Sequence, residues 1–276
     1  MGNIFYASSW GGTATSWLTK VLCMHDNIQC YHGTRYFEDN KNCQEISGID
    51  YAQELNSRAE DGFCVGGIHG YHGDHMEKPI TDLGGAFGFL TREPIQRISS
   101  LFNHHLSKSK KPENFSNYKF MIDNFITQNG EMLQYLAKFG CFPNAAEKQG
   151  TDAELLFTWN MSHALLFEST ALNSKAPVFK MEDYTTDPEQ FKKLFRYFTK
   201  ESLTCSQNYL DEVFSVGRAN THRATRSTSE AEFCSWNKNQ KLIFYILLKN
   251  NRAIIDYYDA IGYPKVKEII QMIEKS

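Results

Sequence analysis

The sequence predicts an α/β fold of three layers, in which helices cover both faces of a central parallel sheet. Short apolar segments that read as buried strands alternate with segments of helical period along the chain. The chain has 276 residues, of which 41% are hydrophobic, so it is long enough to bury such a core without metal or disulfide support. No repeat or domain-separating linker interrupts it, and we expect one domain over residues 1–276 with a helical C-terminal half.

Four buried strands are expected, and a helix follows most of them. The strands are expected at 4–8, 63–68, 86–90 and 177–181. Pro94 and Pro188 favour helix starts, because proline in the first turn lacks only an N–H that would have no intrahelical partner. Longer helical patterns fill about 115–139, 152–173 and 236 to the end. Small and polar residues follow the strands, where parallel sheets bind ligands.

Charge and cysteine content exclude several classes of function. A formal charge of -3 argues against a general nucleic-acid-binding protein. No secretory or membrane-spanning pattern is visible. The seven cysteines are scattered and odd in number, which favours reduced thiols in a cytoplasmic protein over a disulfide framework or a zinc site.

The segment after the first expected strand has the composition of an anion-binding loop. Ser9-Trp10-Gly11-Gly12-Thr13-Ala14-Thr15-Ser16-Trp17 offers small residues, through which backbone N–H groups can approach an anion, and hydroxyls at the start of a helix. A tight strand–helix turn closed by an N-cap is the structural alternative. The segment does not match the GxxxxGK[ST] pattern of a standard phosphate-binding loop.

A second motif joins the expected strand at 86–90 to a helix. Thr91-Arg92-Glu93-Pro94 places an arginine at the end of the strand, and Ser100 follows eight positions later. The planar guanidinium suits phosphate oxygens, because it can make several charge-assisted hydrogen bonds at once. Arg97 is expected to form an ion pair on the surface.

His69 follows the expected strand at 63–68, between the two motifs. An imidazole titrates near neutral pH and can accept a proton from an attacking hydroxyl, whereas a hydrogen-bonded structural histidine is the alternative. His72 and His75 continue a spacing of three, but glycines at 70 and 73 argue against a regular helix and no fourth ligand is evident. We therefore expect no metal site, and His72 and His75 are candidates for lining the entrance through which the molecule that carries the attacking hydroxyl, the acceptor, would reach His69.

These motifs, in this order, resemble the sulfotransferase family that uses 3'-phosphoadenosine 5'-phosphosulfate (PAPS). The resemblance runs from about residue 3 to 263 and implies a fold of the P-loop NTPase type with PAPS as sulfuryl donor. It implies that the first loop holds the 5'-phosphosulfate, that Arg92 and Ser100 bind the 3'-phosphate, with Ser99 as a substitute for Ser100, and that His69 is the general base. A basic stretch in the position of the family's nucleotide-covering loop makes Arg223 and Arg226 further phosphate ligands. The implied first-loop residues are Gly11, Gly12, Thr13, Ala14, Thr15, Ser16 and Trp17.

The first loop departs from the family pattern at one position. Aligned on Trp17, Ala14 falls on the usual glycine and Gly12 on the usual basic residue, which neutralises the leaving group. Another cation then substitutes, the loop aligns differently, or activity is impaired. The candidate cations are Lys20, Arg218, Arg223 and Arg226.

The sequence thus predicts transfer of a sulfuryl group from PAPS to a hydroxyl or amine of a carbohydrate or small-molecule acceptor. It predicts no nucleic-acid partner and no membrane insertion, and it leaves the oligomeric state open. Two alternatives remain. One is a P-loop kinase acting on a small metabolite, and the other is a sulfotransferase-like protein that binds nucleotide or glycan without catalysis.

Overall fold

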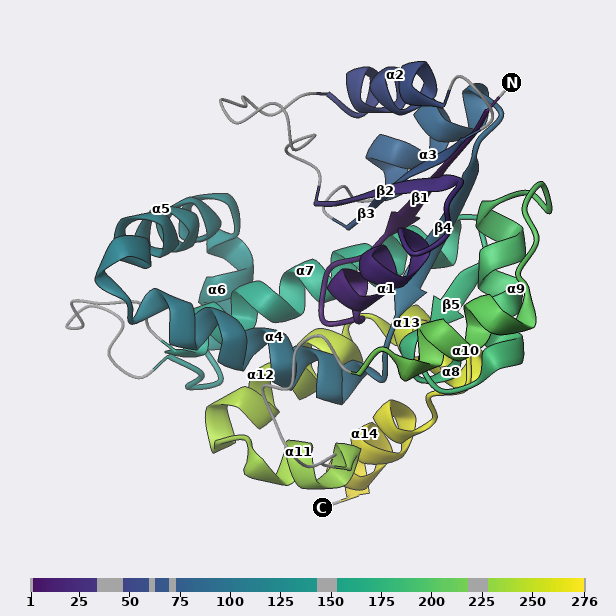
Figure 1. The fold of residues 1–276 in the computed structure, drawn as a ribbon. Coiled ribbons are helices and arrows are strands. Elements are labelled where there is room, and N and C mark those ends of the chain that lie inside the picture. Colours follow the sequence, from purple (N-terminus) through teal and green to yellow (C-terminus); the bar gives the residue numbers. More distant parts are fainter. Residues whose placement is uncertain are drawn as a thin grey trace. The chain divides into compact units, whose positions relative to one another are not determined.

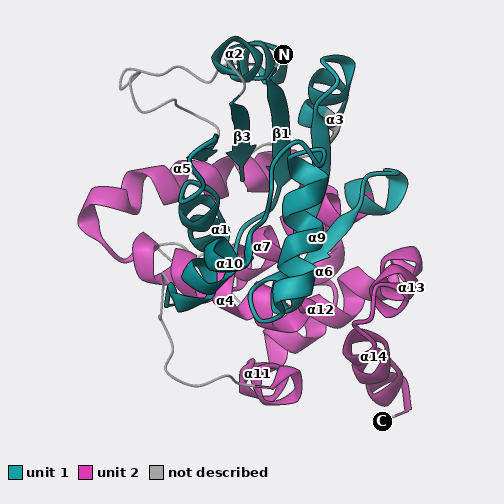
Figure 2. Ribbon diagram, turned by 45° about the vertical axis from the view of Figure 1, so that its right-hand side comes forward, with its two compact units in different colours: residues 1–92, 170–225 teal, residues 93–169, 226–276 magenta. Residues whose placement is uncertain are grey.

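The computed structural model describes residues 2–33, 47–59, 63–69, 73–142, 153–217 and 228–275. Its contacts divide the chain into two compact units, each built from two separate segments (Figure 2). Unit 1 comprises Met1–Arg92 and Thr170–Thr225, and unit 2 comprises Glu93–Ser169 and Arg226–Ser276.

Unit 1 contains a five-stranded parallel sheet of order β2-β3-β1-β4-β5 (Figure 1), which confirms the α/β class and the parallel sheet. The strands are β1 (Asn3–Ser8), β2 (Ile28–His32), β3 (Cys64–Ile68), β4 (Ala86–Thr91) and β5 (Val178–Lys180). Sequence patterns indicated four of them. β2 was not expected, because its burial alternates over only five residues.

Helices cover both faces of this sheet, as expected for three layers. Successive strand residues point to opposite faces. Phe5 of β1 contacts Phe198, with ring centroids 5.2 Å apart, whereas Tyr6 contacts Tyr51 on the other face at 6.0 Å. One face therefore carries α1 (Thr15–Leu22), α9 (Pro188–Phe198) and α10 (Gln207–Ser215), and the other carries α2 (Gly48–Arg58) and α3 (Gly73–Asp82). The short α8 (Met181–Tyr184) links β5 to α9.

Unit 2 is helical in its described part. Its helices are α4 (Pro94–Ser109), α5 (Pro112–Gln128), α6 (Gly130–Ala137), most of α7 (Ala153–Asn173), α11 (Ser229–Ser235), α12 (Lys238–Lys249), α13 (Arg252–Ala260) and α14 (Lys265–Lys275). The helical pattern expected over 115–139 is two helices, because the chain leaves helical geometry at Asn129, where φ is -122°. The predicted proline starts are confirmed at Pro94 and Pro188.

The strand connections create a place for a ligand. The connection from β1 to β2 runs through α1 on one face of the sheet. The connection from β3 to β4 runs through α3 on the opposite face. Neighbouring strands whose connections diverge leave a crevice at their carboxyl ends, where α/β sheets bind ligands. In this sheet the strand order puts the position expected for a ligand at the carboxyl ends of β1 and β3.

Candidate functional site

Three predicted site features meet at the carboxyl edge of the sheet. β1 lies between β3 and β4, with Ala7 opposite Ile68 and Ser8 opposite Phe89. The first loop leaves β1 at this edge, His69 follows β3, and Arg92 follows β4. Residues that are far apart in the sequence are therefore neighbours in unit 1, and the hydrogen bonds below connect them.

The first loop is closed by its own hydroxyl groups. The Ser9 and Thr13 hydroxyl oxygens lie 2.6 Å apart, and the Gly11 N–H donates to Ser9 Oγ at 2.9 Å. Gly11 and Gly12 have φ of 107° and 69°, and Ala14 has φ of 53°. Left-handed residues in such a turn direct successive N–H groups to one concave side, which is a general anion-binding arrangement.

The start of α1 lacks the side-chain N-cap that the structural alternative for this loop requires. Ala14 occupies the N-cap position and makes no side-chain capping hydrogen bond. The first N–H groups of a helix have no intrahelical partner and carry partial positive charge. The geometry therefore fits an anion at the α1 N-terminus better than a turn closed by its N-cap side chain.

Arg92 and Tyr184 hold the first loop from the other side of β1. Arg92 Nη1 donates to the Gly12 carbonyl oxygen at 3.2 Å, and the Tyr184 hydroxyl donates to the Thr13 carbonyl oxygen. Tyr184 is buried and stacks with Trp17, their ring centroids being 6.5 Å apart. The partly buried Arg92 guanidinium therefore lies against the loop, and its cationic charge is part of this site.

His69 is held in one tautomer at the end of β3. The backbone N–H of His69 donates to the Ala7 carbonyl at 3.0 Å, and its ring Nδ1 lies 2.8 Å from the Ser9 carbonyl oxygen. A carbonyl oxygen only accepts, so Nδ1 carries the hydrogen and Nε2 keeps its lone pair. Burial lowers the pKa of His69, and the bond to Ser9 partly opposes this effect. The ring is thus a neutral proton acceptor near pH 7.

Sequence reasoning missed a second histidine at this edge. His32 ends β2, and its Nε2 lies 3.0 Å from Thr15 Oγ1 and 3.4 Å from Ser16 Oγ. Its ring centroid is 5.6 Å from that of His69. Burial lowers the pKa of His32, and the neighbouring His69 lowers it further. The sequence feature that could have identified His32 is its place at the end of a short segment of strand-forming residues, Cys30-Tyr31-His32.

Two serines and one arginine of the second motif belong to unit 2. Ser100 is exposed on α4, whereas Ser99 is buried and accepts a hydrogen bond from Trp236 Nε1 at 2.7 Å. Arg97 is not on the surface, so that expectation is wrong. It is fully buried in an ion pair with the equally buried Glu168. Two charges in a buried position are retained only when each neutralises the other.

Other candidates fall away from the site or outside the described residues. Lys20 is exposed in the last turn of α1, and His75 is exposed on α3. His72, Arg218, Arg223 and Arg226 lie outside the residues that the structure describes. Within the described ranges, no group of three His, Cys, Asp or Glu residues could hold a metal ion.

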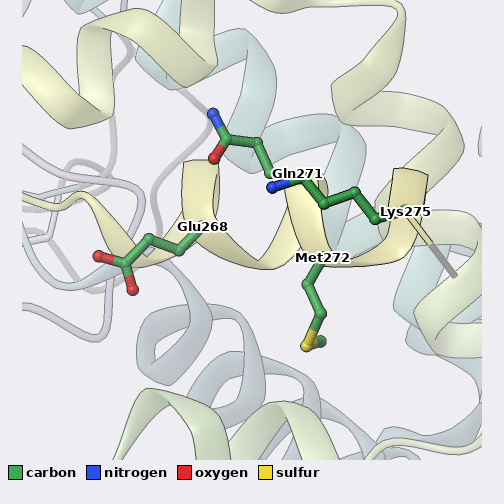
Figure 3. A pocket seen from close by; sticks show the side chains of 4 residues that line it. All are labelled: Glu268, Gln271, Met272 and Lys275. Atoms are coloured by element: carbon green, nitrogen blue, oxygen red, sulfur yellow. The ribbon is translucent and has the colours of Figure 1, made fainter.

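A surface depression in unit 2 has none of the features of a catalytic site. Figure 3 shows that its lining side chains all belong to α14, and they are Glu268, Gln271, Met272 and Lys275. Glu268 is paired with Lys265 at 2.8 Å. One exposed helix face does not enclose a ligand, so the carboxyl edge of the sheet remains the candidate site.

Comparisons with known proteins add a distant structural likeness. No family model and no curated protein matches the chain. A solved structure, that of the mouse sulfotransferase SULT7A1 complexed with PAP, is similar with a TM-score of 0.49 and 11% sequence identity, over 92% of this chain and 89% of that chain. No described helix is both long and apolar enough to cross a membrane. The case for a function therefore rests on the residues at the carboxyl edge.

Proposed function

We propose that this protein is a sulfotransferase that moves the sulfuryl group of PAPS to a hydroxyl or amine of a carbohydrate or small-molecule acceptor. One observation carries the proposal. The first loop, His69 and Arg92 leave three adjacent parallel strands at the same edge, and hydrogen bonds connect His69 and Arg92 to that loop. The motif resemblance assigns these residues to phosphosulfate binding, proton transfer and nucleotide binding.

The first loop fits a phosphosulfate group. Gly11 and Gly12 present no side chain to the concave side of the loop, and the uncapped α1 N-terminus adds partial positive charge. PAPS, when bound, supplies an activated sulfuryl group whose leaving group is a phosphate. Gly11 to Trp17 would hold its 5' end, with Arg92 adjacent. Ser100, Arg223 and Arg226 are assigned to the nucleotide by resemblance, and this assignment stays a prediction.

His69 would act on the acceptor. Its Nδ1–H is engaged by the Ser9 carbonyl, which orients the ring, and its Nε2 lone pair can take the proton of the attacking hydroxyl or amine. Its pKa is lowered by burial, so the imidazole is the free base at neutral pH. The loop donors would stabilise the negative charge that develops on the leaving phosphate.

The Arg92→Ala variant tests the nucleotide assignment. Loss of a charge-assisted hydrogen bond should weaken binding of adenosine 3',5'-bisphosphate (PAP) roughly 10- to 100-fold in calorimetry. The matched control is Arg196→Ala, because Arg196 is exposed on α9 of the same unit and should not affect affinity. Thermal melting of both variants separates lost binding from lost folding, since Arg92 also contacts Gly12. Unchanged affinity in a folded Arg92→Ala protein would refute the assignment.

A non-catalytic nucleotide-binding protein is the second candidate, and Gly12 favours it because the family's basic residue is missing there. Radiolabelled transfer from PAPS to pooled sugars, phenols, alcohols and amines separates the two. Transfer to any acceptor supports the enzyme, whereas tight PAP binding with no transfer supports the binding protein. Tighter binding of Mg-ATP than of PAP would instead indicate a kinase. None of the six described cysteines forms a disulfide, and reduced cysteines favour a reducing compartment such as the cytoplasm.

A further inference from the structure

The first loop lacks a positively charged side chain of its own to neutralise a bound anion. Gly12 stands where the resembling family carries its cation, and Lys20 lies in the last turn of α1, away from the loop. A phosphosulfate group carries at least two negative charges. The backbone N–H groups and Arg92 alone would have to neutralise these charges, unless another cationic side chain lies at the α1 N-terminus.

His32 reaches that position. Its Nε2 is within hydrogen-bond distance of the hydroxyls of Thr15 and Ser16, the first two residues of α1. The Thr15 hydroxyl is both a donor and an acceptor. When the imidazole is protonated, Nε2–H can donate to Thr15 Oγ1, which leaves the Thr15 hydrogen available to an anion.

The groups around His32 determine when it is charged. His69 faces it from β3, and burial together with His69 lowers the pKa of His32 in the free protein. From α2, Tyr51 donates to the Gly33 carbonyl at 3.4 Å, and Arg58 donates to the Tyr31 hydroxyl at 3.0 Å while paired with Glu54. Arg92 follows β4 on the other side of β1, and its guanidinium contacts the first loop at Gly12. Arg58 and Glu54 contact Tyr31, whose side chain points to the opposite face of β2 from that of His32, so His69 is the titratable neighbour that acts on the His32 imidazole.

We propose that His32 is the cation that replaces the missing basic residue, taking up one proton from solvent when the anionic 5' end of the nucleotide binds and acting on it through Thr15. This inference rests on the proposed function. A nearby anion favours the protonated imidazole. Because His69 is 5.6 Å away, a charged His32 also disfavours protonation of His69, which keeps the proposed base free. His32 is thus a positioning and charge-balancing residue, and His69 remains the base.

The test is proton uptake on PAP binding, measured by calorimetry at pH 7.5 in two buffers of different ionisation enthalpy. The wild-type protein should take up a fraction of a proton, and its affinity should fall as the pH rises between the free-state and bound-state pKa values of His32, by at most about tenfold per pH unit. His32→Gln should lose the part of both effects that exceeds the background from the phosphate groups of PAP. His32→Lys should retain affinity at high pH with no uptake above that background, because lysine is already charged.

His25→Gln is the matched control, since His25 precedes β2 at the opposite edge of the sheet, where its ring contacts Phe195 and Tyr209. It should behave as the wild type. The phosphate groups of PAP also titrate in this range, but equally in every variant. Uptake and affinity unchanged in His32→Gln, or uptake lost in His69→Gln but kept in His32→Gln, would overturn the inference while leaving PAP binding intact. A wild-type protein that does not bind PAP overturns the proposed function itself, and this inference with it.

Discussion

Backbone strain at single residues is concentrated at the candidate site. Four described residues other than glycine have φ in the left-handed region, namely Ala14, His69, Lys200 and Glu201. The last two form the turn after α9, whereas Ala14 and His69 lie in the first loop and at the end of β3. A left-handed residue with a side chain costs roughly 1–2 kcal/mol. Such strain persists where surrounding contacts enforce it, and active sites are a common place.

The position of Ala14 explains part of the sequence resemblance. With φ of 53°, this position suits glycine, and glycine is the residue that the resembling family carries there. The resemblance at this point therefore concerns backbone conformation as well as residue type. It supports the alignment of the loop on Trp17, which places Gly12 at the position of the missing cation.

The pH dependence of turnover should identify His69 as the base. Burial lowers its pKa, and a general base must be deprotonated, so kcat/KM should be lost as the pH falls through a pKa below the ordinary value of about 6.5. His69→Gln should reduce kcat by roughly 100-fold or more and remove this acidic limb, with PAP affinity retained. A His69→Gln enzyme with full turnover at saturating substrates would exclude the role.

At the scale of elements, β3 depends on two glycines. A Cβ at Gly66 would lie 2.0 Å from the Phe5 ring, and a Cβ at Gly67 would lie 2.7 Å from the Tyr51 hydroxyl. The aromatic side chains of β1 and α2 fill the space above and below β3. Glycine in the interior of a strand is otherwise unfavourable, so its presence here reflects close packing. That packing holds β3 against β1 and thereby positions His69 beside the first loop.

Substitution of Gly66 tests this packing. Gly66→Ala should destabilise the protein by roughly 1–3 kcal/mol, because Phe5 is fully buried and its ring cannot move away without displacing the core. The control is Gly217→Ala in the same unit, where a Cβ would meet nothing within 4 Å and φ is not left-handed. Chemical denaturation measures both free energies of unfolding. Equal stability of the two variants would contradict the close packing.

At the scale of the whole molecule, neither unit is a continuous piece of the chain. The core of unit 1 combines β1, β3 and β4 with residues that come about 90 to 200 positions later in the sequence. These later residues are Tyr184, Phe191, Leu194, Phe195, Phe198, Tyr209, Leu210 and Val213. Unit 2 is likewise completed by the segment that begins at Arg226. The two units therefore need the full chain, and a single domain over 1–276 stays a prediction.

A truncation tests this interdependence. A fragment of residues 1–176 should not reach a native fold, because it lacks α9 and α10 and exposes apolar residues of β1 and α1 that they cover. We expect strong binding of a hydrophobic dye and loss of near-UV circular dichroism relative to the full chain. A fragment with a cooperative melting transition and no dye binding would show that the N-terminal residues form a sufficient core.

Local sequence patterns predicted the strands that are most apolar and the helices that begin at proline. β1, β3, β4 and β5 are runs of this kind, whereas β2 alternates buried residues with exposed ones such as Gln29 over only five positions and gives no comparable signal. The same limitation hid α2 and therefore the Tyr51 contact with the sheet. Hydrophobic periodicity indicates which residues can be buried, and this pattern is hard to detect where an element is short and half exposed.

The sequence by itself determined the α/β class, the anion-binding composition of the first loop and the placement of His69 and Arg92 directly after strands. Only the tertiary structure decided that β1 lies between β3 and β4, which makes these residues neighbours. It also placed His32 against Thr15 and buried Arg97 with Glu168. The physical reason is that strand order and ion-pair burial depend on contacts between distant segments, whereas composition and period describe each segment alone.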